Sequence, residues 1–132
     1  MANVPITLNP KFSVLVVEDN PERIAYFREK LKGYDLTVAT TPAEGVKAVE
    51  SRRFDVVFLD HDAVPVFVKP DDPNHDTMTF FPVAKALAAQ KYNGNVIIHS
   101  FNPVGAIRMQ ILLGRTAFVK RIPFGQFTLV KG

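Results

Sequence analysis

The sequence lacks several features that would point to particular classes of protein. It has no cysteine among its 132 residues, which excludes a disulfide framework and a thiolate zinc site. Its first residues do not join a basic segment to an apolar one, as a secretion signal does. No apolar run approaches the roughly 20 residues that cross a bilayer. We therefore expect a cytoplasmic protein that makes no use of a membrane.

The sequence also has little excess of charge of either sign. The 16 Lys and Arg residues exceed the 13 Asp and Glu residues by only three, and the pI is near 9.3. Adjacent basic residues occur only as the pairs 52–53 and 120–121. Such a surface permits nucleic acid binding without requiring it. With 47% hydrophobic residues, a chain of this length is expected to fold as a single domain over residues 1–132.

Short apolar runs alternate with segments of helical periodicity. The runs are typical of strands buried on both faces, and they cover residues 13–17, 36–39, 54–59, 95–98 and 117–120. Asn20, Thr41 and Asn102 each precede a proline, which is a helix-start signal. Helical segments follow them, and another is expected over 81–89, after a long loop over 61–78. This order predicts an α/β fold of flavodoxin-like, three-layer type with a five-stranded parallel sheet.

The last covering helix of such a fold is missing or replaced by an extended tail, because residues 126–130 have the pattern of an extended segment. One face of the sheet must then be covered in another way. The N-terminal segment, the tail, or a partner chain such as a second copy in a homodimer could each cover it.

Polar residues follow four of the five predicted strands, at the edge where open α/β sheets bind ligands. They are Glu18, Asp19, Asp60, His61, Asp62, His99, Ser100, Asn102, Lys120 and Arg121. Converging carboxylates repel one another unless a cation compensates them, and oxygen ligands suit a hard cation such as Mg²⁺ or Mn²⁺. We therefore expect a divalent metal site, whose candidate ligands are Glu18, Asp19, Asp60 and Asp62.

A metal at this edge would make a good seat for a phosphoryl group. The candidate phosphate-binding residues are Ser100, Asn102, Thr77, Lys120 and Arg121. Simpler explanations also stand. Asp19 and Asp60 could be capping or loop carboxylates, and Asn102 and Thr77 could be helix caps.

Histidine is the side chain whose ordinary pKa lies near neutral pH, and two histidines occur at this edge. His61 and His99, with Asp60, are candidate catalytic residues for opening a 2′,3′-cyclic phosphate, one activating water and the other protonating the departing ribose oxygen. Alternatively, His99 is a buried structural residue and His61 orients a neighbouring carboxylate. His75 is expected to be a solvated loop residue.

Residues 14–20 and 55–60, with Ser100 and Lys120, resemble a two-component receiver domain, or response regulator. The resemblance implies that Glu18 and Asp19 bind Mg²⁺, that Asp60 accepts a phosphoryl group, and that Ser100 supplies the switch hydroxyl. It also implies a lysine directly before a proline. Here Arg121 and Ile122 separate Lys120 from the proline, so Lys120, Arg121 or neither fills that position.

A narrower family fits better. Residues 59–62, 76–77, 99–109 and 121–124 resemble the cyclic-phosphate-processing receiver-like family of bacteria and phages. The resemblance implies a metal-dependent phosphoesterase acting on, or a protein binding, 2′,3′-cyclic phosphate ends of RNA. The chain departs from the family by a longer loop before Asp76 and by Met78 in place of a usual glycine.

Three functions therefore remain open. The first is a stand-alone receiver-fold protein that acts on or binds a phosphate group. The second is a single-domain response regulator phosphorylated on Asp60. The third is a degenerate receiver fold that serves as a binding or structural subunit in a bacterium or phage.

Overall fold

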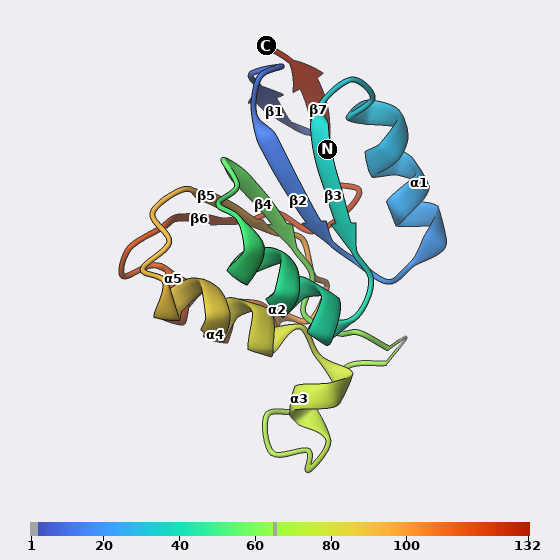
Figure 1. The fold of residues 1–132 in the computed structure, drawn as a ribbon. Helices are drawn as coiled ribbons and strands as arrows, with labels where there is room; N and C mark the ends of the chain where they lie inside the picture. The colour runs from blue at the N-terminus through green and yellow to red at the C-terminus, as the bar shows by residue number, and fades with distance from the viewer. Residues whose placement is uncertain (1–2, 65) are drawn as a thin grey trace.

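The computed structural model describes residues 3–64 and 66–132 (Figure 1). The strands are β1 (Val4–Leu8), β2 (Ser13–Val17), β3 (Asp35–Ala39), β4 (Val56–Leu59), β5 (Asn95–Ile98), β6 (Phe118–Arg121) and β7 (Phe127–Lys131). The helices are α1 (Pro21–Lys30), α2 (Pro42–Ser51), α3 (His75–Met78), α4 (Phe81–Ala89) and α5 (Pro103–Leu113).

Five strands form a parallel sheet in the order β3-β2-β4-β5-β6, which confirms the predicted fold class. The register is even across its centre: Val17 of β2 is level with Leu59 of β4, which is level with Ile98 of β5. The residues that follow these strands therefore lie side by side at one edge of the sheet. This register brings positions 18, 60 and 99 together.

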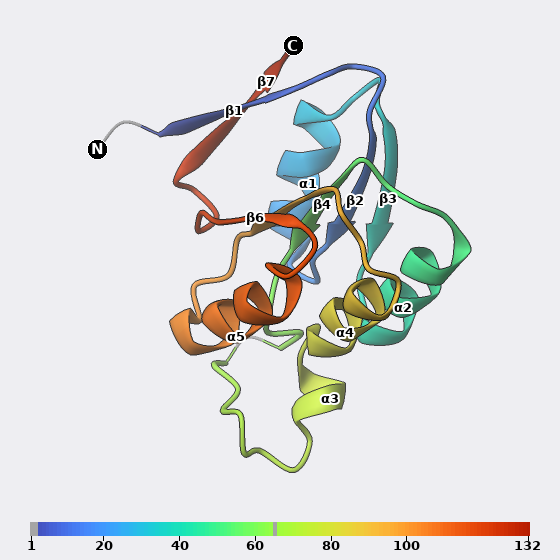
Figure 2. The same ribbon diagram turned by 90° about the vertical axis from the view of Figure 1, so that its left-hand side faces the viewer.

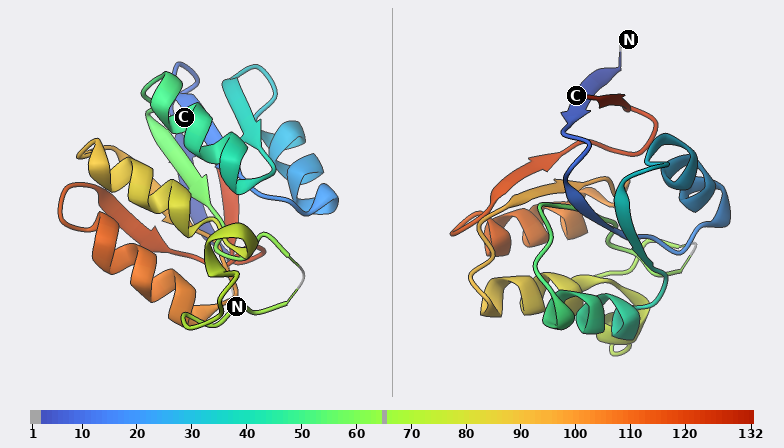
Figure 3. Two further views of the ribbon diagram at one scale, coloured as in Figure 1. Left: turned by 60° about the horizontal axis from the view of Figure 1, so that its bottom comes forward. Right: turned by 45° about the horizontal axis from the view of Figure 1, so that its top comes forward.

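Helices α2, α4 and α5 cover one face of the sheet, along the lower side of the right-hand view in Figure 3. Their apolar residues, such as Val49, Leu87 and Met109, pack with Leu15 and Val57 of the sheet. Each of these side chains is almost completely buried, as a parallel sheet between two layers requires.

The other face is covered by α1 together with a second, two-stranded sheet in which β1 and β7 run parallel. Phe27 of α1 and both Phe127 and Leu129 of β7 pack with Phe58 and Ile97 of the main sheet. Figure 2 shows β1 and β7 side by side, on the opposite side of the sheet from α5. The extended tail has thus replaced the last helix, and the N-terminal segment and the tail cover the face together.

The helix starts follow the predicted signals. The side chains of Asn20, Thr41 and Asn102 accept hydrogen bonds from the first backbone N–H groups of α1, α2 and α5, which satisfies donors that have no partner within the helix. The expected loop over residues 61–78 was wrong at its end, since α3 forms there. No helix in the described parts of the chain is long and apolar enough to cross a membrane.

Candidate functional site

A buried cluster of Glu18, Asp60 and His99 lies at the carboxyl ends of β2, β4 and β5. One ligand atom from each residue lies within 4.8 Å of the others. His99 Nε2 is 3.0 Å from Glu18 Oε1, and both side chains are fully buried. Two carboxylates and an imidazole this close together need a shared proton or a cation to balance their charge.

Glu18 is held as a carboxylate by the turn that follows β2. Its Oε2 accepts hydrogen bonds from the backbone N–H groups of Asp19 and Asn20, at 3.0 and 3.1 Å. Burial alone would raise the pKa of Glu18, but the hydrogen bond and charge of His99, with the Asn20 N–H and Arg23, lower it to about 2. Glu18 therefore remains an ionised carboxylate from neutral pH down to a pH of about 2.

Asp60 behaves in the opposite way. It is only 5% exposed, and its Oδ1 accepts a hydrogen bond of 2.8 Å from the backbone N–H of His61. Burial raises the pKa of Asp60 to about 7; the charge of His99 opposes this rise and that of Glu18 adds to it. Two neighbouring carboxyls with opposite pKa shifts are typical of functional sites.

Arg23 is the cation that sequence reasoning missed. Its Nη1 lies 3.5 Å from Glu18 Oε1 and 3.8 Å from Asp60 Oδ2. Its guanidinium also lies over the rings of Phe101 and Phe124. The sequence did contain a signal for this residue: Arg23 lies in the first turn of α1, three residues after the Asn20 cap. Side chains on a helix tilt toward its N-terminus, which here lies at the ends of the strands.

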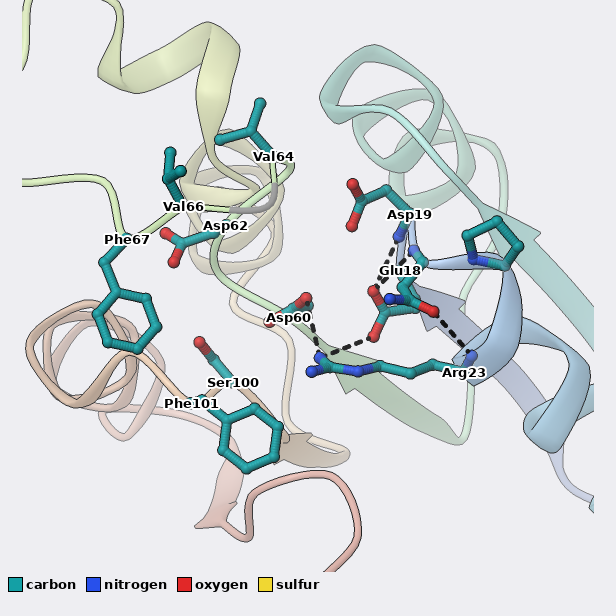
Figure 4. Close-up of a pocket in the computed structure, with 12 residues that line it drawn as sticks. Glu18, Asp19, Arg23, Asp60, Asp62, Val64, Val66, Phe67, Ser100 and Phe101 are labelled. Carbon is teal, nitrogen blue, oxygen red and sulfur yellow. Dashed lines mark hydrogen bonds and ion pairs between the residues drawn. The ribbon is translucent and has the colours of Figure 1, made fainter.

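A cavity of about 320 Å³ opens above this cluster. Figure 4 shows the carboxyl groups and Arg23 around its centre, with Ser100 and the rings of Phe67 and Phe101 on one side. Of the predicted residues, Glu18, Asp19, Asp60, Asp62 and Ser100 line it. Burial, and then the charge of Glu18, raise the pKa of Asp19.

His61 lies behind Asp62 rather than in the cavity. His61 Nδ1 is 2.7 Å from Asp62 Oδ1, and Asn102 Nδ2 donates to both Asp62 oxygens at 3.2 and 3.3 Å. The ring fits only because residue 105 is glycine, since a Cβ there would lie 2.4 Å from the imidazole. Asn102 is thus both the α5 cap, as predicted, and a donor that fixes Asp62.

Neither predicted catalytic histidine is among the residues that line the cavity. Each contacts a carboxylate that does, since His99 faces Glu18 and His61 faces Asp62. His61 Nε2 and His99 Nδ1 are buried, and neither has a hydrogen-bond partner among the described residues. Buried nitrogens of this kind are uncommon, and they leave both rings able to accept or donate one further bond.

The remaining predicted phosphate ligands lie elsewhere. Lys120 is level with Ile97 in the sheet, so its side chain points to the face that β1 and β7 cover, where it lines another cavity. Arg121 follows it on β6 and is exposed. Thr77 donates to the carbonyl of Asn74 and lines a cavity beside α2.

His75 is not the solvated loop residue that we expected. It is 8% exposed, with Nδ1 2.9 Å from Asp76 Oδ1 and Nε2 3.2 Å from Arg108. Hydrogen bonds from His75 and Lys85 lower the pKa of Asp76. These contacts tie α3 to α5 and α4.

The donor set at the cluster fits a divalent metal. Glu18, Asp60 and His99 offer two oxygens and one nitrogen, and Asp19 and Asp62 line the same cavity. This mixture suits Mn²⁺ as well as Mg²⁺. The guanidinium of Arg23 provides the compensating charge in the structure described here.

Comparison with known proteins agrees with this architecture. The family model described as the cyclic-phosphate processing receiver domain matches residues 14–115. No curated protein sequence matches the chain.

Among solved structures, NtrX from Brucella abortus has 17% identity and a TM-score of 0.61, over 89% of this chain but only 24% of its own. A Francisella response regulator receiver domain has 22% identity and a TM-score of 0.56, over 83% and 84% of the two chains. A CheY-like receiver domain from Methanospirillum hungatei has 17% identity and a TM-score of 0.57, over 87% and 82%. At these identities the structures establish the fold alone.

Proposed function

The chain belongs to the cyclic-phosphate processing receiver domain family, and from this we propose that its cavity binds a phosphate group above a divalent cation. The observation that carries the proposal is the buried cluster of Glu18, Asp60 and His99 beneath an open cavity. Buried carboxylates converge in this way where a cation binds. A phosphate group then completes the balance of charge.

The residues divide into three roles in this proposal. Glu18, Asp60 and His99 would hold the cation, which would supply positive charge to polarise a phosphoryl oxygen. The Ser100 hydroxyl donates to a phosphate oxygen from the cavity wall. Asp62, fixed by Asn102 and His61, orients water at the same wall.

The reaction that we propose is the hydrolysis of a 2′,3′-cyclic phosphate, such as the end of an RNA. A water oxygen bonds to phosphorus, one bond between phosphorus and a ribose oxygen breaks, and a proton from water ends on the released hydroxyl. His61 acts through Asp62, so it is a positioning residue here, whereas His99 belongs to the group that holds the cation. The rings of Phe67 and Phe101, 66% and 46% exposed, offer a stacking surface for a base.

The experiment measures binding and turnover separately. Purified protein is titrated with Mn²⁺ by calorimetry and then incubated with a 2′,3′-cyclic mononucleotide, whose product is followed by chromatography. Glu18→Gln and His99→Ala should each lose cation binding and turnover, whereas Asp35→Asn, an exposed carboxylate on β3, should keep both. Cation binding without turnover would refute the hydrolysis and leave the cation site; neither activity in the wild type would refute the whole proposal.

A second candidate rests on the position of Asp60. It follows β4 directly and shares the cavity with Ser100, which is the arrangement that the receiver resemblance gives to a phospho-acceptor. Incubation with a small phosphodonor and Mg²⁺ should then add a labile phosphoryl mass that Asp60→Asn abolishes. An unmodified wild-type chain would argue against this candidate.

A further inference from the structure

We propose that Arg23 is the phosphate-recognition residue of the cavity. It takes the role that the receiver resemblance gives to Lys120. This inference rests on the proposed function, because it names the group that receives the phosphate. It is carried by the location of Arg23 in the cavity wall, by its loose ion pairs, and by the two rings that hold it.

The charge around the cavity requires a cation at this place. Four carboxyl residues line it, namely Glu18, Asp19, Asp60 and Asp62. Among the described lining residues, Arg23 is the single lysine or arginine. An anion that enters meets repulsion from the carboxylates, so a positive group beside them determines whether it binds. Lys120 cannot supply this positive charge, because it lies on β6 and its side chain lines a different cavity.

The present contacts of Arg23 are weak ones. Both ion pairs are made through the single nitrogen Nη1, at 3.5 and 3.8 Å. These lengths exceed the 2.7–2.9 Å that is typical of a charge-assisted hydrogen bond. A guanidinium has five N–H donors in a planar fork that matches two phosphate oxygens. A phosphate in the cavity could therefore form better bonds to Arg23 than Glu18 and Asp60 do.

Two aromatic rings hold the guanidinium in place. Its central carbon is 5.0 Å from the ring centroid of Phe101 and 5.2 Å from that of Phe124. Such contacts attract a cation and lower its exposure to water, and the Arg23 side chain is 23% exposed. The group is thus oriented before a ligand arrives, which reduces the entropy lost on binding.

The same geometry makes Arg23 a competitor of the cation. The Arg23 guanidinium forms ion pairs with Glu18 and Asp60, which are two of the three candidate metal ligands. Removing that charge should therefore have two opposite effects: weaker binding of phosphate and tighter binding of a divalent metal. A residue that only supports the fold would weaken both together.

The test compares four variants of the whole chain: Arg23→Gln, Arg23→Lys, Lys120→Gln and Arg28→Gln. Arg28 is a matched control, because it is an exposed arginine on the same helix. Inorganic phosphate is titrated by calorimetry with Mg²⁺ present. Mn²⁺ is titrated without phosphate and followed by electron paramagnetic resonance. Urea unfolding of each variant verifies that it is folded.

Arg23→Gln should weaken phosphate binding by about 10- to 100-fold, the usual effect of losing hydrogen bonds to a charged group. Arg23→Lys keeps the charge without the fork, so its loss should be intermediate. Lys120→Gln and Arg28→Gln should match the wild type, and Mn²⁺ should bind Arg23→Gln more tightly than the wild type.

If the wild type binds phosphate and both Arg23→Gln and Arg23→Lys bind it equally well, the inference is overturned while the proposed function stands. If Arg23→Gln does not fold, the Arg23→Lys result decides. Absence of phosphate binding by the wild type, with or without the metal, would refute both the inference and the function on which it rests.

Discussion

Replacing the buried Asp60 with asparagine should stabilise the protein, although Asp60 is central to the proposed site. Burial raises the pKa of this carboxyl from an ordinary value of 3.8 to about 7. At pH 8 the folded chain must therefore keep a charge in a poorly solvated place, whereas the unfolded chain keeps it in water. Asparagine has nearly the same shape and no charge, so this cost disappears.

The magnitude follows from linkage between protonation and folding. Each pKa unit corresponds to about 1.4 kcal/mol, so the shift to about 7 is worth about 4 kcal/mol at most. Between about pH 4 and pH 7 the folded state binds the proton and the unfolded state does not, so wild-type stability falls as the pH rises. The advantage of Asp60→Asn should grow by about 1.4 kcal/mol per pH unit over this range and become constant above pH 7.

Urea unfolding from pH 4 to pH 8.5, with a chelator present to remove divalent cations, measures this difference directly. Groups that do not interact with Asp60 titrate in both proteins and cancel. Asp35→Asn is the control: Asp35 is exposed and its hydrogen bond to Arg52 lowers its pKa, so any effect has the opposite sign. A difference that stays flat between pH 4 and pH 7 would refute the reasoning and show that Arg23 and His99 keep Asp60 ionised.

Three further predictions concern neighbouring parts of the structure. Gly105→Ala should cost about 1–3 kcal/mol of stability and displace His61, because the added Cβ would lie 2.4 Å from its ring; unchanged stability with an unshifted His61 NMR signal would contradict this. Phe127→Ala should cost about 3–5 kcal/mol in urea unfolding, because β7 fills the layer left by the missing helix, and a cost below 1 kcal/mol would mean that β7 packs loosely. Glu18→Gln should flatten the acid limb of the stability curve, since the lowered pKa of Glu18 gives stability that is present above about pH 4.5 and lost as the pH falls through about 2; an acid limb identical to the wild type would count against the His99 pairing.

Much of the fold could be predicted because its signals are local. Apolar runs and capped prolines lie within a few residues of one another. The bounds of α4 and the starts of α1, α2 and α5 were predicted correctly. The convergence of Glu18, Asp60 and His99 was also foreseeable, since the ends of parallel strands meet at one edge. One of the two roles left open for His61, orienting a neighbouring carboxylate, agrees with its contact to Asp62, whereas the sequence did not indicate that His99 would contact Glu18.

The missed features depend on distant contacts. The place of Arg23 in the first turn of α1 is a local signal, but its role depends on Asp60, which is 37 positions further along the chain. Lys120 was expected at the site, but the register of β6 with β5 turns its side chain to the other face. The extended segment near residue 127 was predictable, whereas its pairing with β1 was not, because a strand pattern does not name its partner.

The pairing of β1 with β7 has a consequence for how the chain folds. It joins segments as far apart as Asn3 and Thr128, whose side chains share a hydrogen bond across 125 positions. Contacts of such large sequence separation stabilise the chain only after the entropy cost of closing a long loop has been met. The five-stranded sheet, built from neighbouring βαβ units, should therefore form first, and the small sheet should close over it last. By the same argument it should open first, so hydrogen exchange at β1 and β7 should report a lower opening free energy than at β2, β4 and β5.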